Sequence, residues 1–262
     1  MTKNTDPELA PATISEADGV RYLHLGTPWV QGAMRIRKSL ALELEYIQRM
    51  MAWMLLRPEA DLTRGHAVQL GLGAAAITRF CHSVLRLRCT AVELNPSVID
   101  ACRIWFHLPT ASARFAVLPM DAADFVADAE RVDTVDVLCV DLYDHDAASP
   151  VLDSAEFYRD CHRVLVEGGV MSVNLFGRNA SFGLSAARIA AAFGDSQVVI
   201  LQPTREGNTI VVALKGTPLP NAETMQTRAD NIERRFEVPA KKWLRMIRPL
   251  GIGAERPSQG LE

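Results

Sequence analysis

The stretch QVVILQPTREGNTIVVALK, residues 197–215, distinguishes between the α/β folds that this chain could adopt. It contains two strand-like runs, residues 197–202 and 209–215, on either side of a polar segment that includes Pro203 and Gly207. Parallel neighbours need a crossover of about a dozen residues or more, so a gap this short predicts an antiparallel hairpin. Any sheet that these residues complete must therefore end in an antiparallel pair.

Upstream of this hairpin, strand-like runs alternate with helical stretches. The strand candidates are residues 67–70, 88–93, 114–118, 134–141 and 170–175. These strands are hydrophobic on both faces, so neither face can be exposed to solvent. This pattern indicates a parallel sheet with helices on both faces. Five such strands and a terminal hairpin predict an α/β fold of the class I methyltransferase type, which is Rossmann-like, with a mostly parallel seven-stranded sheet. A dinucleotide-binding Rossmann domain would continue with another βαβ unit instead.

Composition narrows the class of protein further. The 262 residues are 48% hydrophobic and 23% charged, with a formal net charge of −3, which favours an ordered domain and disfavours a nucleic-acid partner. No apolar run reaches the roughly 20 residues of a membrane span, and the N-terminus lacks the pattern of a signal peptide. Five scattered cysteines indicate reduced thiols in a cytoplasmic protein, and no metal site is expected.

The chain outside the alternating region is more polar. We expect four parts: a disordered N-terminus over residues 1–19, a short β segment plus a helix over 20–60, a methyltransferase-like catalytic domain over 61–216, and a tail with a helix over 217–262. Helical spacing of apolar residues predicts one helix over residues 40–56 and another over 230–247, which Pro239 should break.

Glycines and carboxylates follow three successive strands. Gly71 and Gly73 follow the first, Glu93 ends the second, and Asp121 with Ala122 follows the third. Glycines permit a tight turn close to a ligand, and a carboxylate in the position of Glu93 suits ribose hydroxyls. Asp121 suits an adenine amine, and it is equally suited to cap the next helix. Because the carboxyl ends of parallel strands meet at one edge, we predict an adenosine pocket there.

Two further aspartates follow the most hydrophobic strand. Asp141 comes directly after it, and Asp144 lies three residues later. A carboxylate at this edge can bind an ammonium or deprotonate an amine nucleophile, and neighbouring carboxylates raise each other's pKa. A turn-forming aspartate cluster is the alternative interpretation. A magnesium site is disfavoured, since no further carboxylate pair is evident.

Several motifs occur in an order that is similar to one known family. They are Val30-Gln31, Leu44-Glu-Tyr-Ile-Gln48-Arg-Met50, Gln69-Leu-Gly-Leu-Gly73, Val92-Glu93-Leu-Asn-Pro-Ser-Val-Ile99, Asp121-Ala122, Asp141-x-x-Asp144, Leu152-x-x-x-Glu156-Phe157-Tyr158 and Leu165-x-x-Gly168-Gly169-Val170. Over about residues 20–215 the chain thereby resembles spermidine synthases. Most of these motifs are shared with methyltransferases, and the paired aspartates with the Leu-x-x-x-Glu-Phe-Tyr run are the more specific part.

The resemblance implies transfer of an aminopropyl group from decarboxylated S-adenosylmethionine to a small amine such as putrescine. Members of the family are often dimers or tetramers, so a homodimer is one expected assembly. The resemblance also implies that Gly71, Gly73, Glu93, Asp121 and Ala122 hold the adenosine part of the donor. It further implies that Gln48 contacts the donor, that Asp141 is the general base, and that Gln31, Asp141 and Asp144 bind the amine.

Three departures from the family keep alternatives open. Ala74 replaces a carboxylate of the glycine loop, Ile47 stands where a tyrosine is expected, and Arg49 replaces a glutamate. Without the carboxylate, discrimination against ordinary S-adenosylmethionine should relax, since a like-charge repulsion is lost. The alternatives are a methyltransferase that uses S-adenosylmethionine and a non-catalytic homologue that binds an adenosine ligand. A nicotinamide oxidoreductase is disfavoured by the terminal hairpin.

Overall fold

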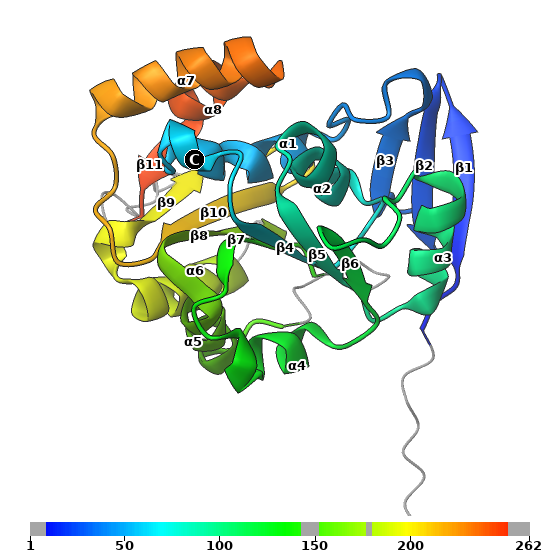
Figure 1. The fold of residues 1–262 in the computed structure, drawn as a ribbon, viewed down its shortest axis with the longest axis horizontal. Helices are drawn as coiled ribbons and strands as arrows, with labels where there is room; N and C mark the ends of the chain where they lie inside the picture. The colour runs from blue at the N-terminus through cyan, green and yellow to red at the C-terminus, as the bar shows by residue number, and fades with distance from the viewer. Residues whose placement is uncertain (1–8, 143–151, 177–179, 251–262) are drawn as a thin grey trace, which may run out of the picture.

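The computed structural model describes residues 9–142, 152–176 and 180–250, which fold around two sheets (Figure 1). The small sheet is antiparallel and has the order β1-β2-β3, with strands β1 (Ala12–Ala17), β2 (Val20–Leu25) and β3 (Gly32–Arg35). The large sheet has the order β11-β9-β10-β8-β7-β4-β5-β6. Its strands are β4 (His66–Leu70), β5 (Arg88–Val92), β6 (Phe115–Leu118), β7 (Val135–Val140), β8 (Leu165–Phe176), β9 (Val198–Leu201), β10 (Asn208–Leu214) and β11 (Ile247–Pro249).

The pairing of these strands confirms the expected fold class. β4 pairs in parallel with β5 and β7, β5 pairs in parallel with β6, and β7 pairs in parallel with β8. β10 is antiparallel to both β8 and β9, as the short gap before Asn208 predicts. The short strand β11 pairs antiparallel with β9 and extends the seven expected strands to eight.

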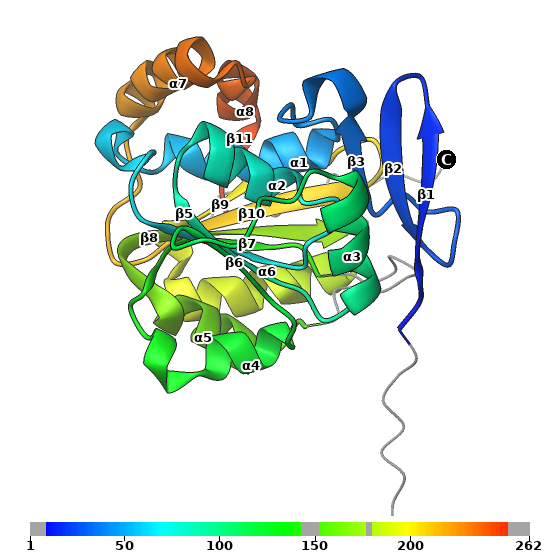
Figure 2. The ribbon, with the colours of Figure 1, turned by 45° about the vertical axis from the view of Figure 1, so that its right-hand side comes forward.

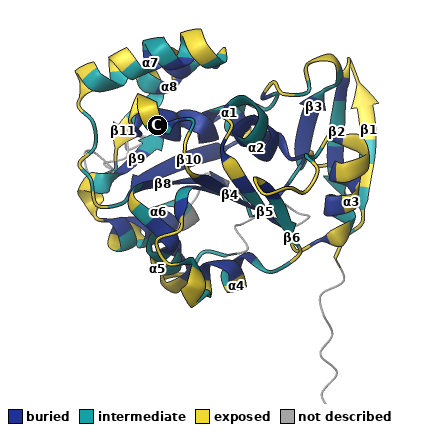
Figure 3. Cartoon of the chain, viewed as in Figure 1, coloured by how far each residue is buried: buried dark blue, intermediate teal, exposed yellow. Residues whose placement is uncertain are grey.

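Helices cover both faces of the large sheet (Figure 2). They are α1 (Glu45–Met50), α2 (Ala76–Arg79), α3 (Pro96–Trp105), α4 (Ala122–Ala127), α5 (Ala155–Val164), α6 (Ala180–Phe193), α7 (Ala222–Phe236) and α8 (Ala240–Met246). One apolar cluster joins the sheet to α1, α7 and α8, and a second joins it to α4, α5 and α6. A third cluster packs the small sheet against α3 and the loop after β4. The central strands β4 and β10 are buried along their whole length, whereas the edge strand β11 is largely exposed (Figure 3).

The helix expected over residues 40–56 is shorter than its pattern indicates. The α-helix runs only from Glu45 to Met50, and Met51–Leu55 continues as a 3₁₀ helix. All five residues of that 3₁₀ segment are buried. Because a segment buried on every side is apolar all round, its hydrophobic pattern does not reveal where the helical period changes.

Both ends of the described chain are more ordered than the polar composition predicts. Residues 12–17, expected to be disordered, form β1, because this strand pairs along its length with β2 and the Ala12 N–H donates to the Ser97 hydroxyl. In the tail, the break at Pro239 is confirmed, but α7 begins at Ala222 after the side-chain cap of Asn221. None of the described helices combines the length and apolar character needed to cross a bilayer.

Candidate active site

A cavity of about 970 Å³ lies at the carboxyl ends of β4, β5 and β7 and gathers most of the predicted site residues. Its walls include the predicted donor-binding residues Gly71, Gly73, Glu93, Asp121 and Ala122, and also Gln31 and Asp141. These side chains come from segments far apart in the sequence. The structure therefore brings the predicted nucleoside pocket and the predicted base into one hollow.

The loop after β4 leaves no room for a side chain at its first glycine. Gly71 has a φ of +81°, and a Cβ built there would lie 2.2 Å from the carbonyl oxygen of Asp141. A Cβ at Gly73, whose φ is +49°, would lie 3.1 Å from the carbonyl oxygen of Gln31. Only glycine adopts such backbone at little cost, so this loop presents bare main chain to the cavity.

Glu93 is held in place by the backbone of the two loops around it. One carboxylate oxygen accepts from the N–H of Leu72 at 2.8 Å, and the other accepts from the N–H of Asn95 at 2.8 Å. Burial raises the pKa of Glu93, while these backbone N–H groups act in the opposite direction. Each carboxylate oxygen has two lone pairs, so the same oxygens can also accept hydrogen bonds from ligand hydroxyls.

Asp121 has both of the roles that its position allows. One of its carboxylate oxygens accepts from the N–H of Ala123 at 2.7 Å and caps α4. The residue also lines the cavity beside Ala122. The cap occupies Oδ1 and orients the carboxylate, so Oδ2 is the oxygen that can face an amino group of a ligand.

Asp141 is oriented by two side chains from distant elements. The amide of Asn174, on β8, donates to Oδ1 at 2.8 Å, and the hydroxyl of Tyr46, on α1, donates to Oδ2 at 3.3 Å. Burial raises the pKa of Asp141 to about 6, although both hydrogen bonds favour the ionised form. A carboxylate with a pKa near neutrality can hold a proton and also release it, which suits a general base.

This pKa predicts how the reaction rate should depend on pH. A base must be ionised, so kcat/KM should fall below neutral pH through an ionisation near 6, the pKa of Asp141. Measuring kcat/KM between about pH 4.5 and 8, with donor binding followed separately, would locate it. A profile that stays flat down to about pH 5 would remove Asp141 from the role of base.

One predicted site residue does not line the cavity, and another lies outside the described part of the chain. The amide of Gln48, predicted to contact the donor, donates instead to the Leu42 carbonyl at 2.7 Å, and the residue does not line the cavity. The physical reason is the turn of α1, which brings Tyr46 rather than Gln48 to the wall. The predicted amine-binding residue Asp144 lies outside the described residues.

Several residues that were not predicted as site residues also line the cavity, among them Tyr46, Asn174, Glu206 and Asn208. Ile47, which stands where the family has a tyrosine, is buried in the core, and Tyr46, one residue earlier, places a hydroxyl on Asp141. The sequence pattern could have indicated Asn174 and Asn208, because a polar amide inside an apolar strand usually has a buried hydrogen-bond partner.

The cavity is lined by acidic side chains. Among the described residues on its wall there are six carboxylates and no lysine, arginine or histidine: Glu43, Glu45, Glu93, Asp121, Asp141 and Glu206. Glu43 accepts from Arg35 in two hydrogen bonds, and Glu45 accepts from Lys242 and Arg49. The other four carboxylates have no cationic partner in the described part of the chain. A concave wall with unpaired carboxylates concentrates cations, so the arrangement favours a positively charged ligand.

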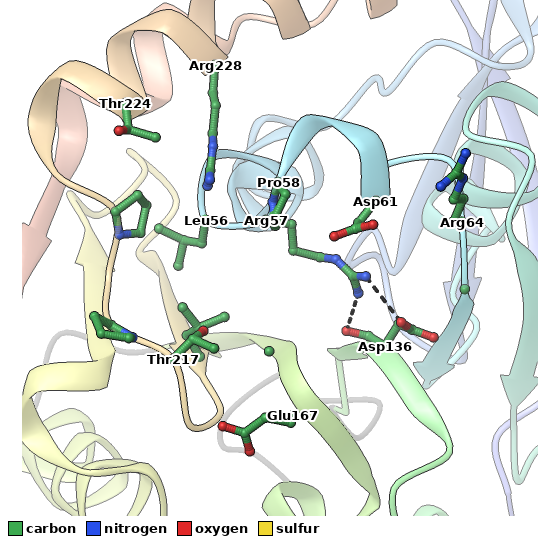
Figure 4. A pocket seen from close by; sticks show the side chains of 15 residues that line it. Leu56, Arg57, Pro58, Asp61, Arg64, Asp136, Glu167, Thr217, Thr224 and Arg228 are labelled. Carbon is green, nitrogen blue, oxygen red and sulfur yellow. Dashed lines mark hydrogen bonds and ion pairs between the residues drawn. The ribbon is translucent and has the colours of Figure 1, made fainter.

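A second cavity, of about 650 Å³, lies at the opposite edge of the large sheet, where β4 and β7 begin (Figure 4). There Arg57 donates to the main-chain oxygen of Asp136 at 2.7 Å and to its carboxylate at 3.1 Å. The other carboxylate oxygen accepts from the N–H of His66 at 2.8 Å. Arg57 and Asp136 therefore satisfy one another, and none of the predicted site residues that the structure describes lines this cavity. The cavity at the carboxyl edge is therefore the candidate active site. Across the described residues, no group of three or more His, Cys, Asp or Glu side chains is arranged to hold a metal.

Comparison with known proteins bears directly on this site. Residues 78–176 match the family model described as the spermine/spermidine synthase domain. A polyamine aminopropyltransferase of Chromobacterium violaceum is 31% identical over 225 residues, which are 85% of this chain and 84% of that protein.

Solved structures show the same fold. A probable spermidine synthase from Corynebacterium glutamicum superposes with a TM-score of 0.70 at 20% identity, covering 94% of this chain and 95% of that one. A spermidine synthase in complex with the transition state analogue AdoDATO superposes with a TM-score of 0.60 at 18% identity, covering 89% and 84%.

Proposed function

Because this chain belongs to the polyamine aminopropyltransferase family, we propose that it transfers an aminopropyl group from decarboxylated S-adenosylmethionine to a small di- or polyamine, with Asp141 as general base. The chain is a transferase. The observation that carries the assignment of the base is the single cavity in which Asp141 lies beside Glu93 and Asp121. The methyltransferase alternative is not favoured by the comparisons.

The proposed reaction is an in-line displacement at one carbon. A nitrogen of the acceptor loses its proton to the Asp141 carboxylate and attacks the donor carbon next to the sulfonium. The new C–N bond forms as the C–S bond breaks, and the sulfur keeps the electron pair, so neutral methylthioadenosine leaves. Holding both reactants in one cavity supplies much of the rate, because positioning removes the entropy of bringing them together.

Each part of the donor has a matching group in the cavity. Glu93 would bind the ribose hydroxyls, and Asp121 with Ala122 would hold the adenine. The glycine loop at Gly71 and Gly73 would pass close to the nucleoside. The acidic wall would attract the donor's sulfonium and ammonium groups and the protonated acceptor.

The position of Ala74 changes how donor selection should be understood. Ala74 is buried in the cluster between the small sheet and α3 and does not line the cavity. A Cβ on Gly32 would lie 2.6 Å from the Ala74 Cβ, so Gly32 and Ala74 pack closely and leave little space for a larger side chain between them. Selection against the carboxylate of ordinary S-adenosylmethionine would then come from the acidic wall as a whole.

Donor competition tests this proposal. Incubation with decarboxylated S-adenosylmethionine and 1,4-diaminobutane should yield methylthioadenosine and a triamine in equal amounts. Ordinary S-adenosylmethionine should bind at least about tenfold more weakly, because its extra carboxylate meets a wall of like charge. Calorimetry with each donor measures this ratio. Absence of methylthioadenosine with a panel of diamines, or tighter binding of the ordinary form, would contradict the proposal.

A further inference from the structure

Glu206 differs from every other carboxylate that the structure places on the cavity wall. Glu43 and Glu45 are paired with cations, Glu93 accepts from backbone N–H groups, and Asp121 caps a helix. Asp141 accepts from Asn174 and Tyr46. Glu206 is exposed and has no ion pair or hydrogen bond within the part of the chain that the structure describes. Its charge is therefore available to a ligand.

The turn that carries Glu206 is fixed at both ends. The Thr204 N–H donates to the Asn208 carbonyl at 2.8 Å, and the Gly207 N–H donates to the Thr204 carbonyl at 3.2 Å. Thr204 and Asn208 are buried, with 5% and 8% of their surfaces exposed. A turn held in this way keeps Glu206 at the cavity without using the Glu206 carboxylate.

A chain of side-chain hydrogen bonds connects this turn to the proposed base. The Asn208 amide donates to the Asn174 carbonyl oxygen at 3.1 Å, and the Asn174 amide donates to Asp141 at 2.8 Å. The backbone N–H of Asn208 also donates to the Thr204 hydroxyl at 3.2 Å. The position of Glu206 is thus tied to that of Asp141 through residues of β8 and β10.

We propose that Glu206 binds the second, protonated nitrogen of the acceptor, while Asp141 takes a proton from the nitrogen that reacts. This inference rests on the proposed function. It makes Glu206 a specificity residue that selects diamines and longer polyamines over monoamines, since a monoamine has no second charge to place there. The apolar side chains elsewhere on the wall, such as Leu142 and Leu152, suit the methylene chain of such an acceptor.

Steady-state kinetics of Glu206→Gln with a matched pair of acceptors tests the proposal. For 1,4-diaminobutane we expect KM to rise about fivefold, near the upper end for a solvent-exposed ion pair, with kcat changed less than about twofold. For 1-aminobutane we expect no change in KM. Glu130→Gln removes an exposed carboxylate outside the cavity lining and serves as the control for net charge.

Direct binding separates this inference from the proposed function. Calorimetry of the two amines, with methylthioadenosine bound, measures the contribution of Glu206 without turnover. If the wild type binds the diamine more tightly than Glu206→Gln but forms no product, the reaction assignment fails while the role of Glu206 stands. If the diamine binds equally to both proteins, does not bind at all, or if both amines weaken equally, the role of Glu206 is overturned.

Discussion

Replacing Asp141 with asparagine should lower kcat for aminopropyl transfer by about a thousandfold, the range in which a positioned general base contributes. Asparagine keeps the shape of the side chain and an oxygen that can accept from Asn174, but it cannot take a proton. The affinity for methylthioadenosine, measured by calorimetry, should change less than about threefold. A variant that retains about a tenth of the wild-type kcat would show that the proton goes elsewhere.

The same substitution should stabilise the fold at alkaline pH, which provides a second readout. The pKa of Asp141 is about 6 in the folded chain, above its usual value of 3.8, so the folded state binds this proton more tightly. The stability that this group contributes is present below about pH 4 and is lost as the pH rises through 6. The asparagine variant avoids the cost of burying the ionised carboxylate, so its Tm should exceed that of the wild type by about 2–6 °C at about pH 8. The gain should be smaller at about pH 5, and a lower Tm at alkaline pH would contradict the raised pKa.

Replacing Glu93 with alanine should weaken donor binding by about a hundredfold or more. The variant loses the carboxylate proposed to bind ribose and also the acceptors for the N–H groups of Leu72 and Asn95. Hydrogen bonds to charged groups contribute about 1.5–3 kcal/mol each. Losing the two that the ribose hydroxyls would donate therefore weakens donor binding by more than a factor of about 100. Calorimetric titration with methylthioadenosine measures the change in Kd.

Two further variants show whether this effect belongs to the nucleoside pocket. Glu130→Gln should leave Kd unchanged. Asp121→Asn retains a good helix cap, so it should affect the nucleoside contact alone and weaken binding by about tenfold. Equal affinity of the wild type and Glu93→Ala for methylthioadenosine would remove Glu93 from the pocket.

Local sequence patterns were sufficient to predict the carboxylates at the carboxyl edge of the large sheet. Glu93, Asp121 and Asp141 each follow a strand, and parallel strands bring their carboxyl ends together whatever the details of packing. Their shared cavity could therefore be predicted from chain order. The hairpin before β10 was predictable for a similar reason, because the short connection excludes a crossover.

Residues on other elements could not be placed in the same way. Gln48 and Tyr46 lie on one short helix, and which of them faces the cavity depends on where that helix begins and how it packs against the sheet. The strand β1 was not predicted from the sequence, because a polar edge strand has little hydrophobic pattern. Its stability comes from pairing with β2. Such pairing is visible only when both partners are placed.

Local chemistry along this chain determined the order of strands and helices, the terminal hairpin, and the carboxylates at the strand ends, since period, chain length between strands and residue type act over short distances. Three features depend on how distant elements pack together: Asn174 and Tyr46 hold Asp141, burial raises the pKa of Asp141, and Glu206 is without a partner in the described part of the cavity. A pKa and a free charge depend on solvent exclusion and on neighbours that are distant in the sequence, and Asn174 and Tyr46 lie 33 and 95 residues from Asp141.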